Sequence, residues 1–145
     1  MIASILINSN NKSNLEKVFN SYEMNASKKD SFEFIVNIDN DDNVTMVYFE
    51  EQIKKREFAI KYLQAYEGDY FSGHINNNKM IEYIDRRSYF ISCTGDRVLN
   101  ETENWDDKLR AYKSFYSDDI FRIRCSSHKE RKYFDFWECC FAPSN

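Results

Sequence analysis

Residues 2–8, with the sequence IASILIN, decide the fold class. The run is almost continuously apolar, which is typical of a β-strand that is covered on both faces. Next along the chain, Ser13 and Glu16 have the spacing of a capping box, in which a hydroxyl and a carboxylate satisfy two backbone amides at a helix start. A stripe of apolar residues then follows at helical spacing, namely Leu15, Val18, Phe19 and Tyr22. This segment therefore predicts a buried strand followed by an amphipathic helix.

Strand and helix patterns continue to alternate beyond this unit. Further strands are predicted at residues 32–38, 70–75, 88–94 and 120–125. Helices are predicted at 50–67, with Ala59, Tyr62, Leu63 and Tyr66 as an inner stripe, at 78–87, and after Asn104, with Trp105, Leu109, Tyr112 and Tyr116 on one side. The alternation predicts an α/β fold with a mostly parallel sheet, right-handed crossovers and helices on both faces.

Composition narrows the possible classes of protein. The chain has 145 residues, of which 42% are hydrophobic, and it contains three glycines and one proline, so residues 1–145 are predicted to form a single domain. The formal net charge is −4 and no basic block stands out, which argues against a nucleic-acid partner. The sequence contains no transmembrane segment and no signal peptide, so we expect a cytoplasmic location. The four cysteines form no C-x-x-C pair, which favours reduced thiols.

Polar residues follow three of the predicted strands. They are Asn8-Ser9-Asn10, the acidic run that begins at Asp39 and Asp41, and Gly95-Asp96. Ligands of parallel sheets bind beyond the carboxyl ends of the strands, so we expect these three segments to line one crevice. The carboxylates there have three possible roles: they can hold a divalent cation, accept hydrogen bonds from a base or a ribose, or simply end a strand.

Several nucleotide and hydrolase motifs are missing. The sequence has no G-x-G-x-x-G after the first strand, no P-loop and no G-x-S-x-G. The loop of residues 8–12 contains no glycine, which argues against a sugar-activating nucleotidyltransferase. These absences exclude the common dinucleotide-binding and serine-hydrolase sites.

The order of the remaining segments resembles family-2-type GT-A glycosyltransferases. The segment SILINSNNKSNLEKVFNSY is similar to the opening strand, loop and helix of that family, and FEFIVNIDNDD is similar to its acidic second strand end. FISCTGDR stands where the family carries its metal-binding acidic signature, and NWDDKLRAYKSF followed by DIFRIRC resembles the next helix and strand. The resemblance covers most of residues 3–124 and implies the nucleotide-sugar-binding part of a GT-A fold.

The resemblance also implies roles for individual residues. Ser9 would face the nucleotide, Asp39 would hydrogen-bond the base or ribose with Asp41 nearby, and Asp96 would ligate Mn²⁺ or Mg²⁺ beside the sugar diphosphate. The implied activity is sugar transfer from a nucleotide-diphosphate sugar to an unknown acceptor hydroxyl.

Two features depart from the family pattern. Arg97 stands where the family usually has a second acid, so we expect Arg97 to contact the phosphates directly, with the cation in doubt. The sequence stops at FWECCFAPSN, roughly where an acceptor-binding region would begin, so a truncated domain is expected and no catalytic base is identified. The alternative is a catalytically degenerate GT-A-like domain that binds a protein partner through its aromatic tail, residues 133–141.

Overall fold

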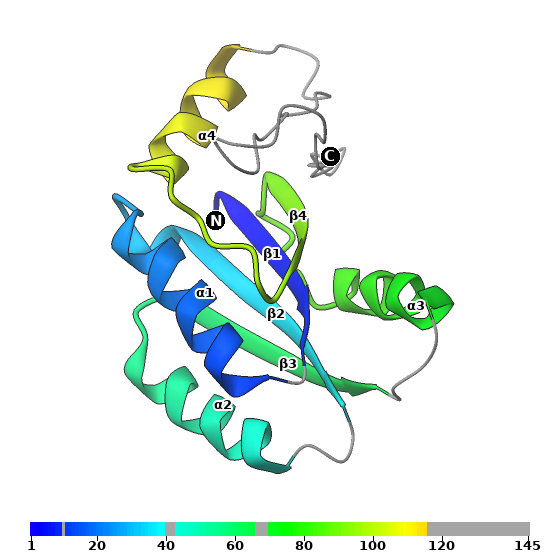
Figure 1. Cartoon of the computed structure of the whole chain (residues 1–145). Helices are drawn as coiled ribbons and strands as arrows, with labels where there is room; N and C mark the ends of the chain where they lie inside the picture. The colour runs from blue at the N-terminus through cyan, green and yellow to red at the C-terminus, as the bar shows by residue number, and fades with distance from the viewer. Residues whose placement is uncertain (10, 40–42, 66–69, 116–145) are drawn as a thin grey trace, which may run out of the picture.

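A computed structural model of the chain describes residues 1–9, 11–39, 43–65 and 70–115. Within these ranges, all strands are parallel and belong to one sheet of order β3-β2-β1-β4 (Figure 1). The strands are β1 (Ala3–Asn8), β2 (Phe32–Asp39), β3 (Ala59–Ala65) and β4 (Phe90–Gly95). The helices are α1 (Lys12–Met24), α2 (Asn43–Lys55), α3 (Tyr70–Ile81) and α4 (Trp105–Phe115), and a short 3-10 turn, η1 (Lys29–Ser31), precedes β2.

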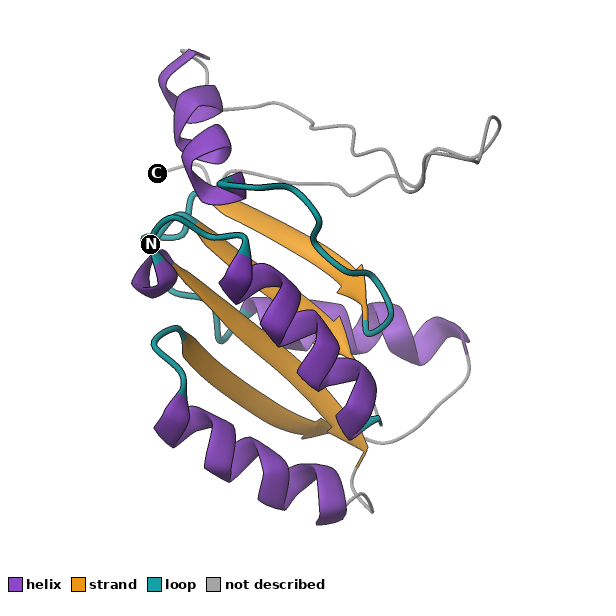
Figure 2. Cartoon of the chain, turned by 60° about the vertical axis from the view of Figure 1, so that its left-hand side comes forward, coloured by secondary structure: helices purple, strands orange, loops and turns teal. Residues whose placement is uncertain are grey.

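Helices cover both faces of the sheet. α1 and α2 lie on one face and α3 lies on the other (Figures 1 and 2). The first face carries an aromatic core around Phe19 and Phe34, whose ring centroids are 4.7 Å apart and whose side chains are fully buried. The second face carries a smaller cluster: Leu6, Ile35, Leu63 and Met80. Burying one large apolar side chain stabilises a fold by about 1.5–3 kcal/mol, so the aromatic core dominates the packing. The prediction of an α/β fold with helices on both faces is confirmed.

The alternation of elements is confirmed as far as β4 and α4, but three spans were predicted wrongly: the helix at 50–67, the strand at 70–75 and the helix at 78–87, of which only residues 78–81 are helical. Residues 43–55 form the second helix, so the described part of the range predicted as a helix at 50–67 is helical only up to residue 55, and β3 occupies residues 59–65 of it. The side chains of β3 alternate between the two faces: Ile60 packs on the aromatic core and Leu63 on the opposite cluster. The predicted strand at 70–75 is instead the first part of α3. The helical stripe that we inferred through Ala59 and Leu63 is the apolar pattern of a strand covered on both faces.

The start of α1 also differs from the prediction. Asn11 caps the helix, and its Oδ1 accepts a hydrogen bond of 3.0 Å from the backbone N–H of Asn14. The predicted cap, Ser13, lies inside the first turn and is exposed. Asn and Ser are comparable N-caps, and the position of the strand end before the helix decides between them. The predicted inner stripe of this helix is correct, because Leu15, Val18, Phe19 and Tyr22 are all buried.

The last described helix begins after Asn104, as predicted. Trp105 is buried against Tyr22 and Phe32, and its Nε1 donates to the carbonyl of Tyr22 at 3.0 Å. Tyr112, which was predicted to lie on the same side of this helix as Trp105, is 44% exposed. The predicted strand at 120–125 and the aromatic tail lie outside the described residues. No helix among those described is long and apolar enough to cross a membrane.

Candidate functional site

The order of the strands reverses next to β1. From β1 the chain adds β2 and then β3 on one side, and then returns to add β4 on the other side of β1. In parallel sheets, ligands bind at such a switch point, beyond the carboxyl ends of the two strands that flank it. Asn8 at the end of β1 pairs in register with Gly95 at the end of β4, so the residues that follow them, Ser9 and Asp96, lie at this point.

A hydrogen-bond network joins the two strand ends. Ser9 Oγ donates to Asp96 Oδ2 at 2.8 Å, and Asn14 Nδ2 donates to the same oxygen at 3.3 Å. Ser9 Oγ also accepts a bond of 3.1 Å from the backbone N–H of Asn11, the cap of α1. Residues from β1, α1 and β4 are thus held together by one hydroxyl and one carboxylate. The structure therefore brings the predicted site residues Ser9 and Asp96 into direct contact.

A second polar network lies beside the first, on the face covered by α3. Asn37 Nδ2 donates to Asn8 Oδ1 at 3.1 Å, and Asn8 Nδ2 donates to Asn77 Oδ1 at 2.7 Å. These two hydrogen bonds form an asparagine ladder (Asn37, Asn8 and Asn77), which links β2, β1 and α3 near the carboxyl ends of the two strands. Asn37 is 4% exposed, and its Oδ1 is buried without a hydrogen-bond partner among the residues that the structure describes. Such an orphan oxygen is costly in a protein interior, so the ladder fixes the backbone of the site at some cost in stability.

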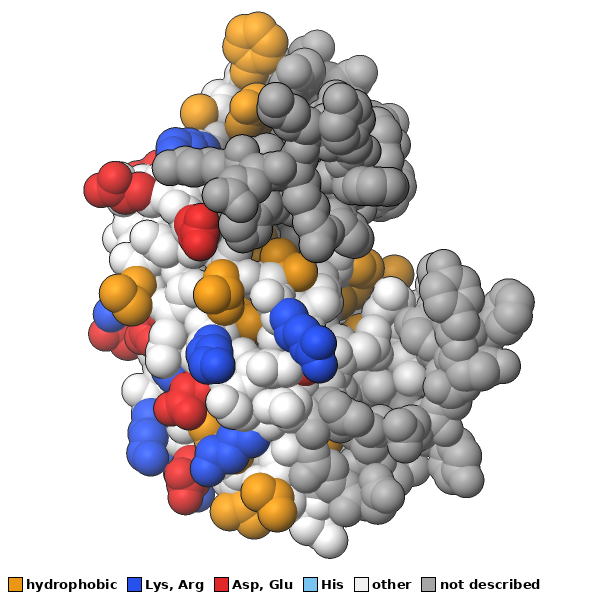
Figure 3. All heavy atoms as spheres, viewed as in Figure 1, with side chains coloured by type: hydrophobic (Ala, Val, Ile, Leu, Met, Phe, Trp, Pro, Cys, Tyr) orange, Lys and Arg blue, Asp and Glu red, His pale blue; other side chains and the backbone are white. Residues whose placement is uncertain are grey.

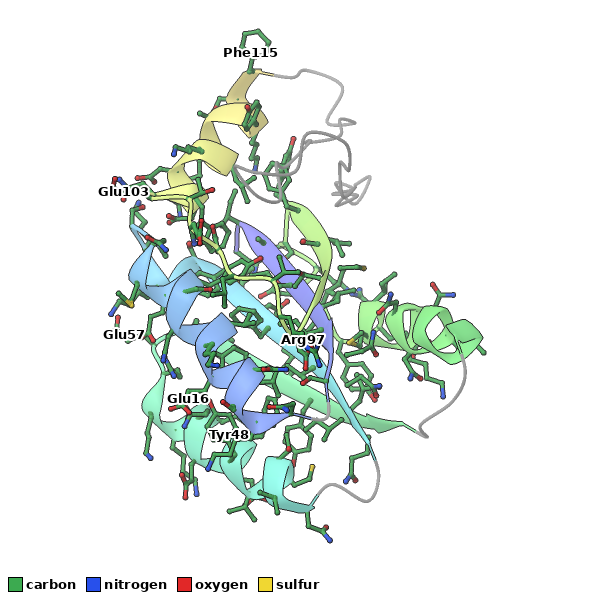
Figure 4. All side chains as sticks on the ribbon, viewed as in Figure 1. Glu16, Tyr48, Glu57, Arg97, Glu103 and Phe115 are labelled. Carbon is green, nitrogen blue, oxygen red and sulfur yellow. The ribbon has the colours of Figure 1, made fainter. Side chains whose placement is uncertain are left out.

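Arg97 lies in the turn that follows β4, at the end of the sheet where β1 also ends (Figure 4). The turn is closed by a hydrogen bond of 3.2 Å from the backbone N–H of Val98 to the carbonyl of Gly95. The Arg97 side chain is exposed, and no residue in the described ranges forms a hydrogen bond or an ion pair with it. Lys and Arg side chains are interspersed with Asp and Glu on this face of the molecule (Figure 3). A guanidinium without a partner carboxylate is available to an anionic ligand.

The structure places Asp39 at the same edge of the sheet. Asp39 is the last residue of β2, and the carbonyl of Asn37, two residues earlier, accepts a hydrogen bond of 3.0 Å from the backbone N–H of Ser9. β1 and β2 are neighbours, so the backbone of Asp39 ends next to the loop that carries Ser9. Asp41 lies outside the described residues.

The side chains that the structure describes do not form a cation centre built by the protein alone. The described ranges contain no cluster of three His, Cys, Asp or Glu side chains that could hold a metal ion. At Asp96, Oδ2 already accepts hydrogen bonds from two neutral donors, and the next residue carries a positive charge. Divalent cations such as Mg²⁺ require several oxygen ligands, and this turn offers one carboxylate.

Sequence reasoning did not identify the asparagines that complete the site. Asn14, Asn37 and Asn77 each hold a neighbouring site residue, yet they lie on a helix, inside a strand and on a second helix. One signal was available for Asn37, since a polar amide interrupts an otherwise apolar strand. A buried amide is retained where it has partners, so its position points to a polar network.

A buried carboxylate lies at the opposite end of the sheet. Glu33 is 1% exposed, and its Oε1 accepts hydrogen bonds from Ser4 Oγ at 2.6 Å and from the backbone N–H of Asp85. Lys61 Nζ lies 2.8 Å from the other oxygen. This cluster ties the loop before β4 to β1, β2 and β3, and it lies at the amino ends of the strands, far from the crevice.

A second buried carboxylate fixes α4. Asp106 is fully buried, and it accepts hydrogen bonds from the backbone N–H groups of Ser27 and Lys28 and forms an ion pair of 2.9 Å with Arg110. Burial raises the pKa of Asp106, but the hydrogen bonds from Ser27, Arg110 and Lys28 outweigh it and hold the pKa below its usual value. Asp106 therefore joins α4 to the loop between α1 and β2.

Comparisons with known proteins agree with this architecture. No family profile matches the sequence, and no curated protein sequence matches it. The structure is similar to that of Staphylococcus aureus TarS 1–349 in complex with UDP, with a TM-score of 0.65, 17% identity, and coverage of 93% of this chain and 38% of that one. It is also similar to TarS 1–349 in complex with UDP-GlcNAc, with a TM-score of 0.62, 16% identity, and coverage of 93% and 37%.

A third similar structure is the mannosyltransferase PcManGT from Pyrobaculum calidifontis in complex with GDP-Man and Mn²⁺. Its TM-score is 0.66 at 13% identity, and the match covers 86% of this chain and 35% of that one. These likenesses show that the chain has a GT-A-type glycosyltransferase fold. The chain spans between 35% and 38% of the length of these three neighbours.

Proposed function

We propose that the chain binds a nucleotide-diphosphate sugar in the crevice between the ends of β1 and β4, as the donor-binding part of a glycosyltransferase. The observation that carries the proposal is the hydrogen bond of 2.8 Å between Ser9 and Asp96 at the switch point of the sheet. Ligands of parallel α/β sheets bind at this place. The similar structures were solved with UDP, UDP-GlcNAc and GDP-Man, which supports a nucleotide-sugar ligand.

Each site residue has a proposed role. Asp39, at the end of β2, accepts hydrogen bonds from the base or the ribose, with Asp41 close to it in sequence. Ser9 faces the nucleotide from the loop after β1, and Arg97 contacts the diphosphate. If Mn²⁺ or Mg²⁺ binds here, Asp96 is the described side-chain carboxylate that would hold it, and the cation would supply positive charge beside the diphosphate.

The proposed reaction is displacement at the anomeric carbon of the sugar. An acceptor hydroxyl attacks that carbon, the bond from the carbon to the diphosphate oxygen breaks, and the nucleoside diphosphate leaves with the electron pair. The proton of the hydroxyl passes to a base, for which the described residues supply no assignment. Positive charge from Arg97 would stabilise the leaving diphosphate, because charge that develops during the reaction is the most effective target for a fixed cation. The cytoplasmic location also remains a prediction.

Thermal unfolding in the presence of ligands tests the proposal. UDP, GDP, UDP-GlcNAc and GDP-Man would each be added to the chain, and a ligand at 100 times its Kd is expected to add about 2.7 kcal/mol of native-state stability. Asp39→Ala should remove the stabilisation, whereas the control Asp30→Ala, at an exposed position before β2, should keep it. If no nucleotide stabilises the chain, the donor site does not exist, and the alternative, a degenerate domain that binds a protein partner, takes its place.

A further inference from the structure

Two adjacent residues of opposite charge in the candidate site do not pair with each other. Asp96 and Arg97 are neighbours in the turn after β4, yet Asp96 Oδ2 accepts its hydrogen bonds from Ser9 Oγ at 2.8 Å and from Asn14 Nδ2 at 3.3 Å. Within the described ranges, no ion pair forms between Arg97 and any carboxylate. The carboxylate is thus engaged by neutral donors, while the guanidinium remains exposed.

The partners of Asp96 point to a positioning function. Its carboxylate holds Ser9 from the loop after β1 and Asn14 from the first turn of α1. Ser9 in turn accepts from the backbone of Asn11. The network therefore fixes the shape of the crevice with no need for a bound cation. Removing Asp96 would release two elements that it joins to β4.

Arg97 has the chemistry that a diphosphate requires. A guanidinium keeps its charge at every working pH, and its planar array of donors matches phosphate oxygens in a bidentate manner. A divalent cation at Asp96 would lie close to this positive charge, and the repulsion between like charges weakens the binding of that cation. A phosphate at the same place is attracted by Arg97 and needs no second carboxylate.

We propose that the chain recognises the diphosphate of its nucleotide ligand through Arg97 without a divalent cation, and that Asp96 is a positioning residue. This inference rests on the proposed function, because it concerns how the same crevice holds its ligand. It departs from the expectation that Asp96 is the ligand of Mn²⁺ or Mg²⁺. The deciding observation is that Asp96 is bound to Ser9 and Asn14 while Arg97 is exposed beside it.

Calorimetric titration tests this inference with UDP and GDP as probes on the full 145-residue chain. Each titration would be run in EDTA and then in Mn²⁺. Binding in EDTA is expected to be at least as tight as in Mn²⁺. Arg97→Gln should weaken it about 10- to 100-fold, because a charge-assisted contact is lost. Arg97→Lys should recover part of this loss, since it keeps the charge and loses the planar fork.

Matched variants separate recognition from folding. Arg86→Gln changes another exposed arginine, in the turn before β4 at the opposite end of the sheet, and should leave binding unchanged. Asp96→Asn keeps an oxygen acceptor for Ser9 and loses the charge that a cation requires; if Asp96 only positions its neighbours, the variant should weaken binding by the same factor in EDTA and in Mn²⁺. Because Arg97 is exposed, the Arg97 variants are expected to fold normally, and their binding decides the question even if Asp96→Asn unfolds.

The possible outcomes are distinct. Binding that appears only with Mn²⁺ and disappears in Asp96→Asn would overturn the inference and leave the proposed function standing. Binding in EDTA that Arg97→Gln does not weaken would overturn the role of Arg97. Failure of every nucleotide to bind, with or without Mn²⁺, would remove the proposed function and this inference with it.

Discussion

Ser9 Oγ donates a hydrogen bond of 2.8 Å to Asp96 Oδ2, although the two residues are separated by 87 positions in the sequence. One follows the first strand and the other follows the fourth, so their contact exists only because β4 returns to lie beside β1. The contact closes the crevice in which parallel α/β proteins bind their ligands. It is the local feature on which the proposed nucleotide site depends.

Ser9→Ala is expected to lower the free energy of unfolding by about 1–3 kcal/mol. The side chain is 9% exposed, and its loss leaves the Asn11 backbone N–H and one oxygen of Asp96 without that partner. Urea unfolding followed by circular dichroism would measure the change. Ser13→Ala is the control, because Ser13 is exposed in the first turn of α1. Equal stability of Ser9→Ala and the native chain would show that the Ser9–Asp96 bond contributes nothing.

The asparagine ladder predicts that substitutions of Asn8 and Asn37 change the free energy of unfolding non-additively. Asn8→Leu alone should destabilise the chain by about 1–3 kcal/mol, because the buried Asn37 amide then loses its acceptor. Asn37→Leu added to it should restore much of the loss, since replacing both partners of a hydrogen bond by apolar groups is nearly neutral. The measurement is a double-mutant cycle in urea. Strict additivity of the two changes would contradict the ladder.

The lowered pKa of Asp106 predicts that the folded chain loses stability in acid. Although burial raises its pKa, the hydrogen bonds from Ser27, Arg110 and Lys28 hold it below the usual value, so the folded state favours the charged form. The stability that this group contributes is therefore present above the unfolded pKa of about 3.9 and is lost as the pH falls through the lower folded value. Asp106→Asn should be less stable than the native chain near neutral pH.

The control for this prediction is Asp107→Asn, at the next position, where the side chain is 53% exposed. Thermal unfolding between about pH 2 and pH 7 would show a shallower acid dependence for Asp106→Asn than for the native chain, because the linked proton is gone. Asp107→Asn should follow the native curve. Parallel curves for the native chain and Asp106→Asn would refute the assigned role of Asp106.

The contacts of Trp105 allow the contribution of α4 packing to stability to be measured. The indole packs on Tyr22 and Phe32 and donates to the carbonyl of Tyr22, so Trp105→Ala should cost about 3–5 kcal/mol. Trp105→Phe keeps the ring and loses the hydrogen bond, and should cost less. Chemical denaturation of both variants would rank them. A cost for Trp105→Phe equal to that of Trp105→Ala would assign the stabilisation to the hydrogen bond and not to packing.

The buried strands were predictable because their chemistry is local. Residues 2–8 are almost continuously apolar, and residues 32–38 place Phe32, Phe34, Val36 and Ile38 on one face; the structure confirms both strands. β3 was not predictable by the same reasoning. It lies at one edge of the described sheet and mixes Lys61 and Gln64 with its apolar residues, so its pattern matches a helical stripe as well as a strand. Its identity comes from pairing with β2, which is a long-range effect.

The site residues likewise divide into those that local sequence predicts and those that depend on long-range contacts. Ser9 and Asp96 could be named from the sequence because polar residues that follow apolar strands gather at one edge of a sheet. Asn14 and Asn77 could not, since their function comes from contacts with residues 82 and 69 positions away. The burial of Asp106 could not be predicted either, because its partners lie in the loop between α1 and β2.

The most direct test of the central claim is to map the nucleotide-binding surface by NMR. UDP and GDP would be titrated into the isotope-labelled chain, and the shifts of backbone amides would be followed. The account predicts that one of them perturbs Ser9, Asn14, Asp96 and Arg97 together, at the ends of β1 and β4, and leaves the amides around Glu33 and Asp85 at the opposite end unchanged. Saturating nucleotide that perturbs none of these four amides would contradict the account.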